Sequence, residues 1–268
     1  MSMMDQYLNP VDFDKLASSI KSASGFPHFC IDNFLKNDFA ESIEASFPSF
    51  SQAESLGKSF NAHHEYQKVQ ITDTKKFPAP LKQLNELFGD EQFIALMSKA
   101  TGIDDLLYDK NLVGGGMHMT NGGGRLDVHV DFNYIKEQKW YRRLNILLYL
   151  NKDWKEEYGG YLDLWDKDVK NRIGYFEPKF NRLCGFVTSE ISFHGVTPVT
   201  CPPDRVRKSF ATYYYTEDKT PDIADDHHST IFVPRPNEKA RHLFLKPVSD
   251  FKQGINQQVK RILNKITK

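Results

Sequence analysis

Cysteine is scarce in this sequence of 268 residues. The chain contains three cysteines, Cys30, Cys184 and Cys201, which are far apart along the sequence and form no Cys-x-x-Cys pair. Structural zinc sites usually draw on closely spaced cysteine and histidine pairs, so this pattern argues against such a site. Widely separated free thiols are typical of a reducing compartment.

Long apolar runs and an excess of charge are also absent. No run of about 18 apolar residues occurs, so the sequence predicts no membrane-spanning helix. Residues 1–16 include acidic side chains and no apolar run, and therefore do not predict a signal peptide. Lysine plus arginine and aspartate plus glutamate balance at 35 each, which gives no electrostatic reason to expect nucleic acid as a partner. A soluble, cytoplasmic protein is expected.

The first 110 residues predict a mainly helical region. Apolar side chains recur at helical spacing in three segments, residues 11–24, 37–48 and 78–101. FPHFCIDNFL, residues 26–35, predicts a short strand, whereas the polar stretch 49–76 predicts an irregular loop. After residue 110 the sequence pattern changes, and glycine pairs alternate with runs typical of strands.

Alternation within those runs predicts a barrel. In RRLNILLYLN, residues 142–151, Leu144 and Leu148 share one face of a strand, while Asn145 and Tyr149 share the other. A mixed inner face suits a barrel whose interior holds both packed core and a polar site. The predicted fold is α+β, mainly β: a double-stranded β-helix, or cupin-like jelly roll, with a helical layer packed on one sheet.

The predicted organisation is a single domain over residues 1–268. Its parts are a helical N-terminal layer with the first strands (1–110), a jelly-roll core (111–216) and a C-terminal segment (217–268). That last segment ends in a basic stretch, residues 251–268, with apolar side chains on one helical face. A helix docked on the barrel is expected there, and a helix that binds a membrane surface or a partner is the alternative.

The stretch GGGRLDVHVDFN, residues 122–133, contains a candidate metal site. His129 and Asp131 lie two positions apart in a strand pattern, so both side chains point to one side. His194, 63 residues after Asp131, is the candidate third ligand. Two histidines and one carboxylate form the facial triad of non-haem Fe(II) oxygenases, which leaves metal positions open for a co-substrate and O₂. The alternative is a surface pair on a hairpin.

Arg207 is a candidate anion-binding residue. It begins the strand-like run RKSFATYYYT and is in phase with Ser209 and Tyr213. A guanidinium group is well shaped to bind a carboxylate through two parallel hydrogen bonds. Arg205 has the same parity but belongs to the loop opened by two prolines, so Arg207 is preferred, and an ordinary arginine at a strand edge is the alternative.

Six motifs in order resemble the 2-oxoglutarate- and Fe(II)-dependent dioxygenases. They are HVD (129–131), YLNKDW (149–154), GGYLDL (159–164), EPKFNRLCGF (177–186), HGVTPV (194–199) and RKSFATYYY (207–215). The chain is most similar to the prolyl 4-hydroxylase-like branch, which includes the oxygen-sensing prolyl hydroxylases. The resemblance covers about residues 112–216, and FPHFCIDNFL extends it weakly toward the N-terminus.

The resemblance implies roles for particular residues. His129, Asp131 and His194 match the catalytic iron ligands, and Arg207 matches the residue that binds the distal carboxylate of 2-oxoglutarate. Tyr149 matches a tyrosine that hydrogen-bonds the same carboxylate. Leu162 matches an apolar wall of that pocket. Fe(II) and 2-oxoglutarate are the expected cofactor and co-substrate, and ascorbate is a further candidate.

One position departs from the oxygen-sensing branch. Ten residues before His129, where that branch has a second co-substrate tyrosine, this chain has Met119, with His118 beside it. His118 is a candidate to replace the missing hydrogen bond, and a plain strand residue is the alternative. Asn133 and Arg143 are candidate substrate contacts.

The expected reaction is hydroxylation of an unactivated C–H bond, coupled to decarboxylation of 2-oxoglutarate to succinate and CO₂. A prolyl residue in a polypeptide is the first candidate substrate, and a free amino acid or other small metabolite is the alternative. A non-catalytic jelly-roll binding protein and a zinc-dependent hydrolase are rival interpretations. Residues 49–76 and 216–235 are candidate lids over the site, because both are long and polar.

Overall fold

The computed structural model describes residues 2–238. The chain divides into two units, residues 1–233 and residues 234–268. Within the described part of the second unit, the only regular element is a short 3₁₀-helix, η3 (Pro236–Glu238). The helix predicted for residues 251–268 lies outside the described residues, so the single-domain organisation stays a prediction.

The first unit begins with most of its helices. Their bounds are α1 (Met3–Tyr7), α2 (Phe13–Lys21), α3 (Asn37–Ala45), α4 (Phe50–Leu56), α5 (Ala79–Phe88), α6 (Glu91–Thr101), η1 (Thr74–Lys76) and η2 (Glu156–Tyr158). Capping explains why α6 begins and ends where it does: the Asp90 side chain accepts from the backbone N–H groups of Gln92 and Phe93, and Gly102 adopts the left-handed conformation. The three segments predicted to be helical are confirmed as α2, α3 and the pair α5–α6. In the part of the chain that the structure describes, no helix is both long and apolar enough to cross a membrane.

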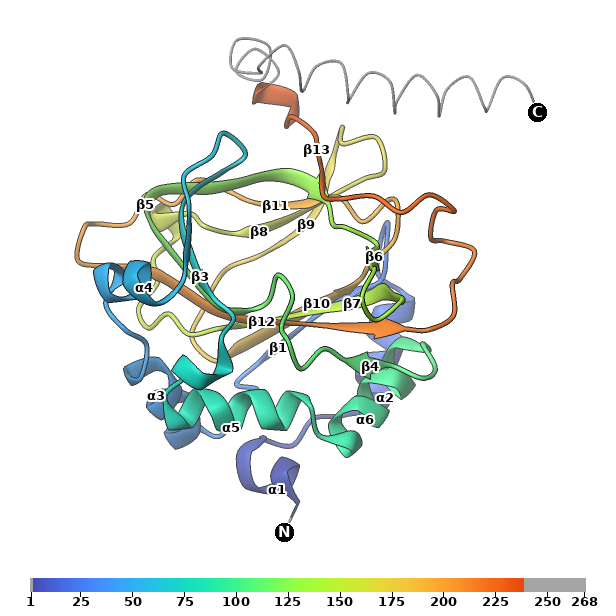
Figure 1. Ribbon diagram of the computed structural model, residues 1–268, viewed down its shortest axis with the longest axis horizontal. Helices are drawn as coiled ribbons and strands as arrows, with labels where there is room; N and C mark the ends of the chain where they lie inside the picture. Colours follow the sequence, from blue (N-terminus) through green and yellow to red (C-terminus); the bar gives the residue numbers. More distant parts are fainter. Residues whose placement is uncertain (1, 239–268) are drawn as a thin grey trace. The chain divides into compact units, whose positions relative to one another are not determined.

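The strands form one antiparallel sheet that folds back on itself. Their bounds are β1 (His28–Asp32), β2 (Lys58–Phe60), β3 (Glu65–Ile71), β4 (Leu107–Tyr108), β5 (Gly116–Val130), β6 (Tyr134–Ile135), β7 (Trp140–Tyr149), β8 (Leu162–Trp165), β9 (Arg172–Phe176), β10 (Arg182–Val187), β11 (His194–Val196), β12 (Arg207–Thr216) and β13 (Ile231–Phe232). The main order is β1-β10-β7-β12-β5-β11-β8-β9. In Figure 1 the strands β1, β10, β7 and β12 form a lower layer, and β5, β11, β8 and β9 form an upper one.

Strand β5 joins the two layers. Its first part pairs with β12, as in Arg207↔Thr120, whereas its second part pairs with β11, as in His194↔His129. The glycines at 122–124 lie between these parts, and Gly123 has a φ of 85°. A Cβ atom at Gly124 would lie 2.4 Å from the Thr120 side chain, so the bend requires glycine there. The two runs that looked separate in the sequence therefore form one bent strand.

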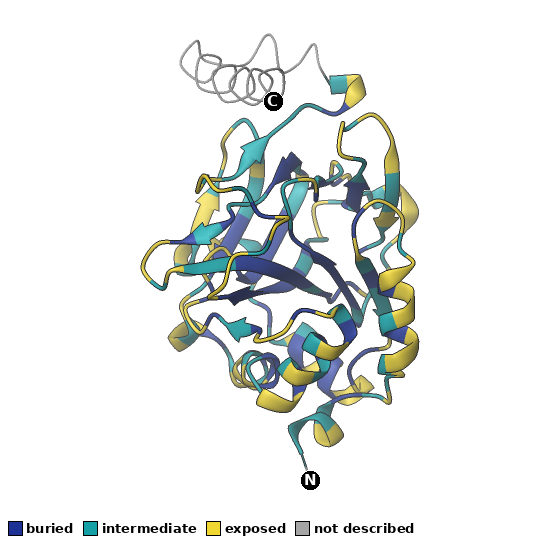
Figure 2. Cartoon of the chain, turned by 90° about the vertical axis from the view of Figure 1, so that its right-hand side faces the viewer, coloured by how far each residue is buried: buried dark blue, intermediate teal, exposed yellow. Residues whose placement is uncertain are grey.

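Helices α2, α3, α5 and α6 cover the outer face of the lower layer, whereas α4 packs on β3 (Figure 1). Leu144, Ile146 and Leu148 of β7 point to that side and are fully buried in the main core, together with Leu84 and Phe88 of α5. Figure 2 shows the buried strands in the centre and exposed residues along the outer sides of the helices. The prediction of a mainly β fold with a helical layer on one sheet is confirmed.

The prediction of an irregular loop over residues 49–76 is wrong. This segment contains α4, β2, β3 and η1, and β3 pairs with β5 over Glu65–Ile71. The misleading signal was polarity: β3 carries Glu65, Lys68 and Gln70 on the side that lines a polar cavity. A bulge between Tyr66 and Lys68, where Gln67 has a φ of 51°, also breaks the strict alternation expected of a strand.

Candidate metal and co-substrate site

The structure brings His129, Asp131 and His194 together. His129 lies near the end of β5, Asp131 directly follows that strand, and His194 begins β11 as the register partner of His129. The Nε2 atoms of His129 and His194 lie 3.5 Å and 3.4 Å from the two carboxylate oxygens of Asp131. One ligand atom from each of the three residues lies within 4.8 Å of the others, which is close enough for them to share one metal ion.

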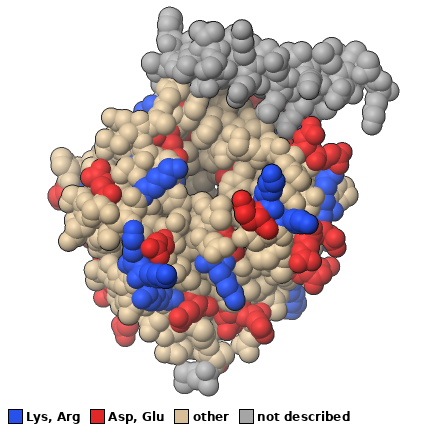
Figure 3. Space-filling model, in the orientation of Figure 1, with Lys and Arg blue, Asp and Glu red and all other residues tan. Residues whose placement is uncertain are grey.

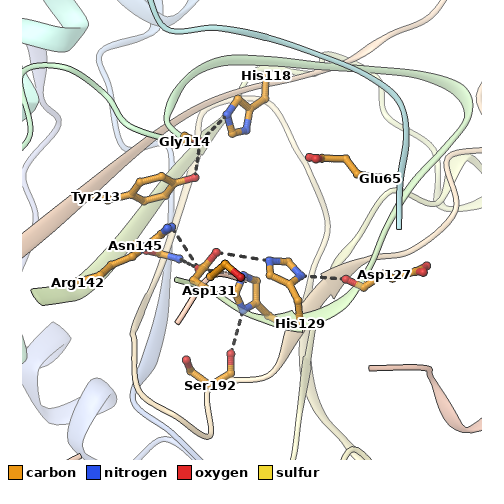
Figure 4. A network of polar contacts seen from close by, with 12 residues as sticks. Glu65, Gly114, His118, Asp127, His129, Asp131, Arg142, Asn145, Ser192 and Tyr213 are labelled. Carbon is orange, nitrogen blue, oxygen red and sulfur yellow. Dashed lines mark hydrogen bonds and ion pairs between the residues drawn. The ribbon is translucent and has the colours of Figure 1, made fainter. Parts of the chain in front are cut away.

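Backbone carbonyls fix the orientation of both imidazoles. His129 Nδ1 lies 2.9 Å from the Asp127 carbonyl oxygen, and His194 Nδ1 lies 2.9 Å from that of Ser192 (Figure 4). A carbonyl oxygen only accepts, so each Nδ1 carries the proton and each Nε2 presents a lone pair toward Asp131. Burial, followed by the neighbouring His129, lowers the pKa of His194 to about 4, which keeps this ring neutral. Two imidazole Nε2 atoms and one carboxylate that face one point fit Fe(II).

A buried arginine holds the Asp131 carboxylate. Arg142 Nη2 lies 3.1 Å from Asp131 Oδ2, and the Asn145 side-chain amide donates to the same oxygen over 2.8 Å. Arg142 Nε also donates to Asn145 Oδ1, and the guanidinium lies between the rings of Phe132 and Tyr213. Burial alone would raise the pKa of Asp131, but Arg142 and the two histidines hold it well below its ordinary value. The carboxylate is therefore ionised and fixed in place.

Two predicted substrate contacts do not lie in this site. Arg143 points away from it, toward Asp222 at 3.5 Å, while Arg142 takes the inner position. The cause is a β-bulge, because Tyr214 pairs with Leu144 but Tyr215 pairs with Arg142, so Arg143 drops out of the alternation. Asn133 hydrogen-bonds Glu190, the Asp226 carbonyl and the His228 N–H, so it ties down the loop after β12.

Three buried donors lie near the other end of the same cavity, which Arg207 and Ser209 line. Tyr149 Oη, Arg207 Nη2 and Ser209 Oγ are buried and have no hydrogen-bond partner among residues 2–238. Arg207 is 3% exposed, forms no salt bridge with a described carboxylate, and donates through Nε to the Gly160 carbonyl over 2.7 Å. Burial lowers the pKa of Arg207 and raises the pKa of Tyr149, and the interaction between these two side chains opposes both shifts.

Glycine at position 160 allows Arg207 to lie in this position. Gly160 has a φ of 70°, and a Cβ atom there would lie 2.9 Å from Arg207 Cδ. Arg205, the competing arginine, donates instead to the Lys152 carbonyl and lines a separate cavity on the outer side, near Phe47. The structure therefore places Arg207 inside the barrel and Arg205 outside it.

His118 lies in the same row of side chains as the unpartnered donors. Ser209 pairs with Tyr149 on one side and with His118 on the other, so all three side chains project into the barrel. His118 Nε2 lies 3.1 Å from the Gly114 carbonyl, and burial holds the pKa of His118 well below its ordinary value. Met119 faces the opposite way and belongs to the helix-covered core. The position ten residues before His129 thus faces away from the cavity, and His118 faces into it.

One cavity of about 390 Å³ connects the two ends. Its lining includes the three triad residues, Arg207, Ser209 and His118, with Leu147, Leu162 and Phe186 as apolar walls. The two predicted lid segments also border it, through Lys58 and Phe60 from the first and Thr230 and Phe232 from the second. Figure 3 shows a hollow in this face of the molecule, with basic and acidic side chains on both sides of it.

Sequence reasoning missed Arg142, Asn145 and Tyr213 as members of the site. Asn145 and Tyr213 could have been predicted from strand alternation. Asn145 has the same parity as Tyr149, and Tyr213 has the same parity as Arg207. Arg142 gave no such signal, since only the bulge turns it inward.

Comparison with known proteins supports the resemblance seen in the sequence. The model of the 2OG-Fe(II) oxygenase superfamily matches residues 115–215. The chain is 29% identical over 206 residues to prolyl 3-hydroxylase OGFOD1 of Mus musculus, a match that covers 71% of this chain and 33% of that protein. The chain thus spans about a third of the length of this curated relative.

Solved structures confirm the fold. A prolyl hydroxylase from Trichoplax adhaerens, in complex with a hypoxia inducible factor peptide, superimposes with a TM-score of 0.57 at 18% identity, covering 76% of this chain and 89% of that one. A prolyl-4-hydroxylase from Pseudomonas putida gives a TM-score of 0.52 at 17% identity, covering 75% and 98%. The predicted jelly roll is therefore confirmed, and the superfamily model matches the residues that carry the His-Asp-His triad.

Proposed function

We propose that this chain is an Fe(II)- and 2-oxoglutarate-dependent dioxygenase that hydroxylates a prolyl residue in a polypeptide. The observation that carries the proposal is the state of Arg207. A buried guanidinium without a carboxylate partner is costly, and Arg207 lies in one cavity with the His-Asp-His triad. Binding of an anionic co-substrate that reaches from the triad to Arg207 removes that cost.

Each end of the cavity has a separate task. His129, Asp131 and His194 would hold the iron, while Arg207 and Tyr149 would bind the distal carboxylate of 2-oxoglutarate. Bound iron supplies the redox chemistry that couples decarboxylation of 2-oxoglutarate to succinate and CO₂ with hydroxylation of the substrate C–H bond. Leu162 and Phe186, both buried, exclude water between the two ends.

The cavity's surroundings support a polypeptide substrate. A second cavity of about 700 Å³ adjoins the site, with Val113 and Phe132 in the lining of both. Its other lining residues include Tyr134 and Ile135, and Val113 is 39% exposed, so this space opens to the surface. An extended peptide needs such a continuation beyond the reacting residue, whereas a small metabolite is served by an enclosed pocket. The relatives named above are prolyl hydroxylases, which makes proline the first residue to test.

The co-substrate site is tested by anaerobic titration of the metal-free protein with Fe(II) and then 2-oxoglutarate. The expected result is the weak visible absorption band of an iron-bound keto acid, lost in Asp131→Ala and retained in Arg205→Gln. Folded, iron-loaded protein that gives no band would refute the dioxygenase proposal and favour a non-catalytic binding protein.

The substrate is tested by release of succinate from 2-oxoglutarate, with and without ascorbate. Proline-containing peptides are compared with matched peptides in which alanine replaces proline, and with free proline. Proline-dependent turnover of peptides, with a mass gain of one oxygen on the prolyl residue, supports the proposal. Turnover with free amino acids alone contradicts the polypeptide substrate but leaves the dioxygenase intact.

A further inference from the structure

Two of the three cysteines lie side by side behind the co-substrate end of the cavity. Cys30 on β1 and Cys184 on β10 are separated by 154 positions in the sequence, yet they are direct register partners in the antiparallel sheet. Their Sγ atoms lie 3.7 Å apart, and both thiols are free. The fold therefore creates a thiol pair that the sequence spacing concealed.

The backbone geometry already suits a disulfide. Directly opposed residues of antiparallel strands have Cα atoms about 4.5 to 5.5 Å apart, inside the range that disulfides require. The remaining change is rotation of the side chains, because a disulfide brings the sulfur atoms to about 2 Å. Cys201 offers no second partner: it lies near residue 205, where its Sγ contacts the Arg205 carbonyl oxygen.

We propose that Cys30 and Cys184 form an oxidation site at which hydroperoxides produce a disulfide, and that this disulfide weakens co-substrate binding. The second half of the proposal rests on the proposed function, because it concerns 2-oxoglutarate. The first half concerns the thiols alone and holds for any activity of the chain.

The chemistry assigns a different role to each cysteine. The Cys30 thiolate attacks one oxygen of hydrogen peroxide, which breaks the O–O bond, forms a sulfenic acid on Cys30 and releases one water once a proton is taken up. Cys184 then attacks the Cys30 sulfur, forms the S–S bond and displaces a second water. Two thiols lose two electrons and two protons, and one peroxide takes up both and is reduced to two waters.

Exposure and charge favour Cys30 as the attacking residue. Cys30 is partly exposed, whereas Cys184 is fully buried. The hydrogen bond from Cys184 Sγ, and then the nearby Arg182, lower the pKa of Cys30 despite its burial. Burial raises the pKa of Cys184 well above its ordinary value. A partly exposed thiol with a lowered pKa and a second thiol behind it are the two parts that peroxide-driven disulfide formation needs.

Packing links the pair to the co-substrate residues. Cys184 belongs to the small buried cluster that contains Tyr149, Leu162 and Phe186. It is also the register partner of Leu147 on β7, which lines the cavity. Movement of Cys184 toward β1 therefore withdraws packing from the wall on which Tyr149 and Leu162 rest, and close-packed interiors transmit such shifts.

The oxidation site is tested on the full-length chain kept free of ferrous iron. Hydrogen peroxide is added in small excess, and intact mass and peptide mapping under non-reducing conditions are measured. The expected product has lost two hydrogens and contains a Cys30–Cys184 linked peptide, which dithiothreitol restores to thiols. Cys201→Ser is the matched control and forms the same link, whereas Cys30→Ser forms none. Folded wild type that stays fully reduced, or that links Cys201 instead, overturns the proposal.

Coupling is tested by comparing the affinity of reduced and oxidised protein for 2-oxoglutarate with Fe(II) bound under anaerobic conditions. Oxidation is expected to raise the dissociation constant about threefold to tenfold in wild type and in Cys201→Ser, but not in Cys30→Ser. Equal affinity of the reduced and disulfide forms overturns the coupling. Absence of 2-oxoglutarate binding in the reduced protein refutes the proposed function instead and leaves the mass measurement valid.

Discussion

The two faces of strands β7 and β12 differ sharply in chemistry although they alternate residue by residue. On the outer face Leu144, Leu148 and Phe210 are fully buried against the helices and carry no polar side-chain atom. On the inner face Tyr149 and Ser209 are equally buried, yet their hydroxyl groups find no partner among the described residues. At these positions the outer face gains stability from burial, whereas the inner face has buried donors that a ligand can satisfy.

The inner face contributes to ligand binding through buried donors that lack a partner among residues 2–238 of the ligand-free protein. An orphaned buried donor costs free energy in the empty protein and recovers it when an anion arrives. Dry packing on the other side of the same strands offsets that cost and holds the donors in position. Substitutions on the inner face should therefore weaken ligand binding without loss of stability. Substitutions on the outer face should lower stability and leave ligand binding unchanged.

The largest effect on binding is expected from Asp131→Ala on the inner face. Loss of a direct ligand should reduce Fe(II) affinity by more than about 100-fold, beyond the range observed for residues that only support a ligand. Isothermal titration with Fe(II) under anaerobic conditions measures this change. Asp166→Asn is the control, because the Asp166 side chain accepts from the backbone of Lys170 and Asn171 in an exposed turn away from the triad. Unchanged affinity in Asp131→Ala would remove Asp131 from the metal site.

The converse substitution is Leu148→Ala on the outer face. Truncation of this fully buried side chain should cost about 2 to 5 kcal/mol of unfolding free energy, since it leaves a cavity in the main core. Fe(II) affinity should stay within error at temperatures where the variant is folded. Denaturant unfolding and the same metal titration report the two quantities. A variant as stable as wild type, or one that is folded but binds iron poorly, would contradict the division between the faces.

The sequence predicted each of these faces where alternation was regular. Leu144, Leu148 and Tyr149 follow the period of two, and the helix-covered side follows from their apolar partners. The prediction failed where a bulge interrupts the period, so that Arg142 and not Arg143 reaches Asp131. It also failed for β3, because a strand that lines a polar cavity resembles a loop in composition. Bulges depend on how two strands fit together, and neither strand's own residues encode them.

Distant pairings were only partly accessible from the sequence. His194 and Arg207 were predicted because the expected chemistry needs a third metal ligand and a partner for an anion. The expected reaction gave no reason to predict a contact between Cys30 and Cys184. That contact depends on the position of β1 beside β10 in the sheet.

Arg207→Gln should separate binding from stability on the inner face itself. Loss of charged hydrogen bonds should weaken 2-oxoglutarate binding about tenfold to a hundredfold. The ligand-free protein should be as stable as wild type or more so, because a buried charge without a partner is removed. Arg205→Gln, on the outer side of the barrel, is the matched control and should change neither quantity. Wild-type affinity in Arg207→Gln together with weakened binding in Arg205→Gln would reverse the assignment of the two arginines.

The smallest effect is expected from Tyr149→Phe, which removes one hydroxyl and keeps the ring. The ring packs with Leu162 and Phe186 and lies 4.9 Å from the Arg207 guanidinium carbon, so these contacts remain. A hydrogen bond to a carboxylate is worth about 1.5 to 3 kcal/mol, and the lower end is expected because Arg207 still holds the same group, which corresponds to about a tenfold rise in the dissociation constant for 2-oxoglutarate. The ligand-free variant should be slightly more stable, because an unpaired buried hydroxyl has gone. Calorimetric titration and denaturant unfolding test both signs, and a variant that loses stability while keeping wild-type affinity would show that the Tyr149 hydroxyl serves the fold and not the ligand.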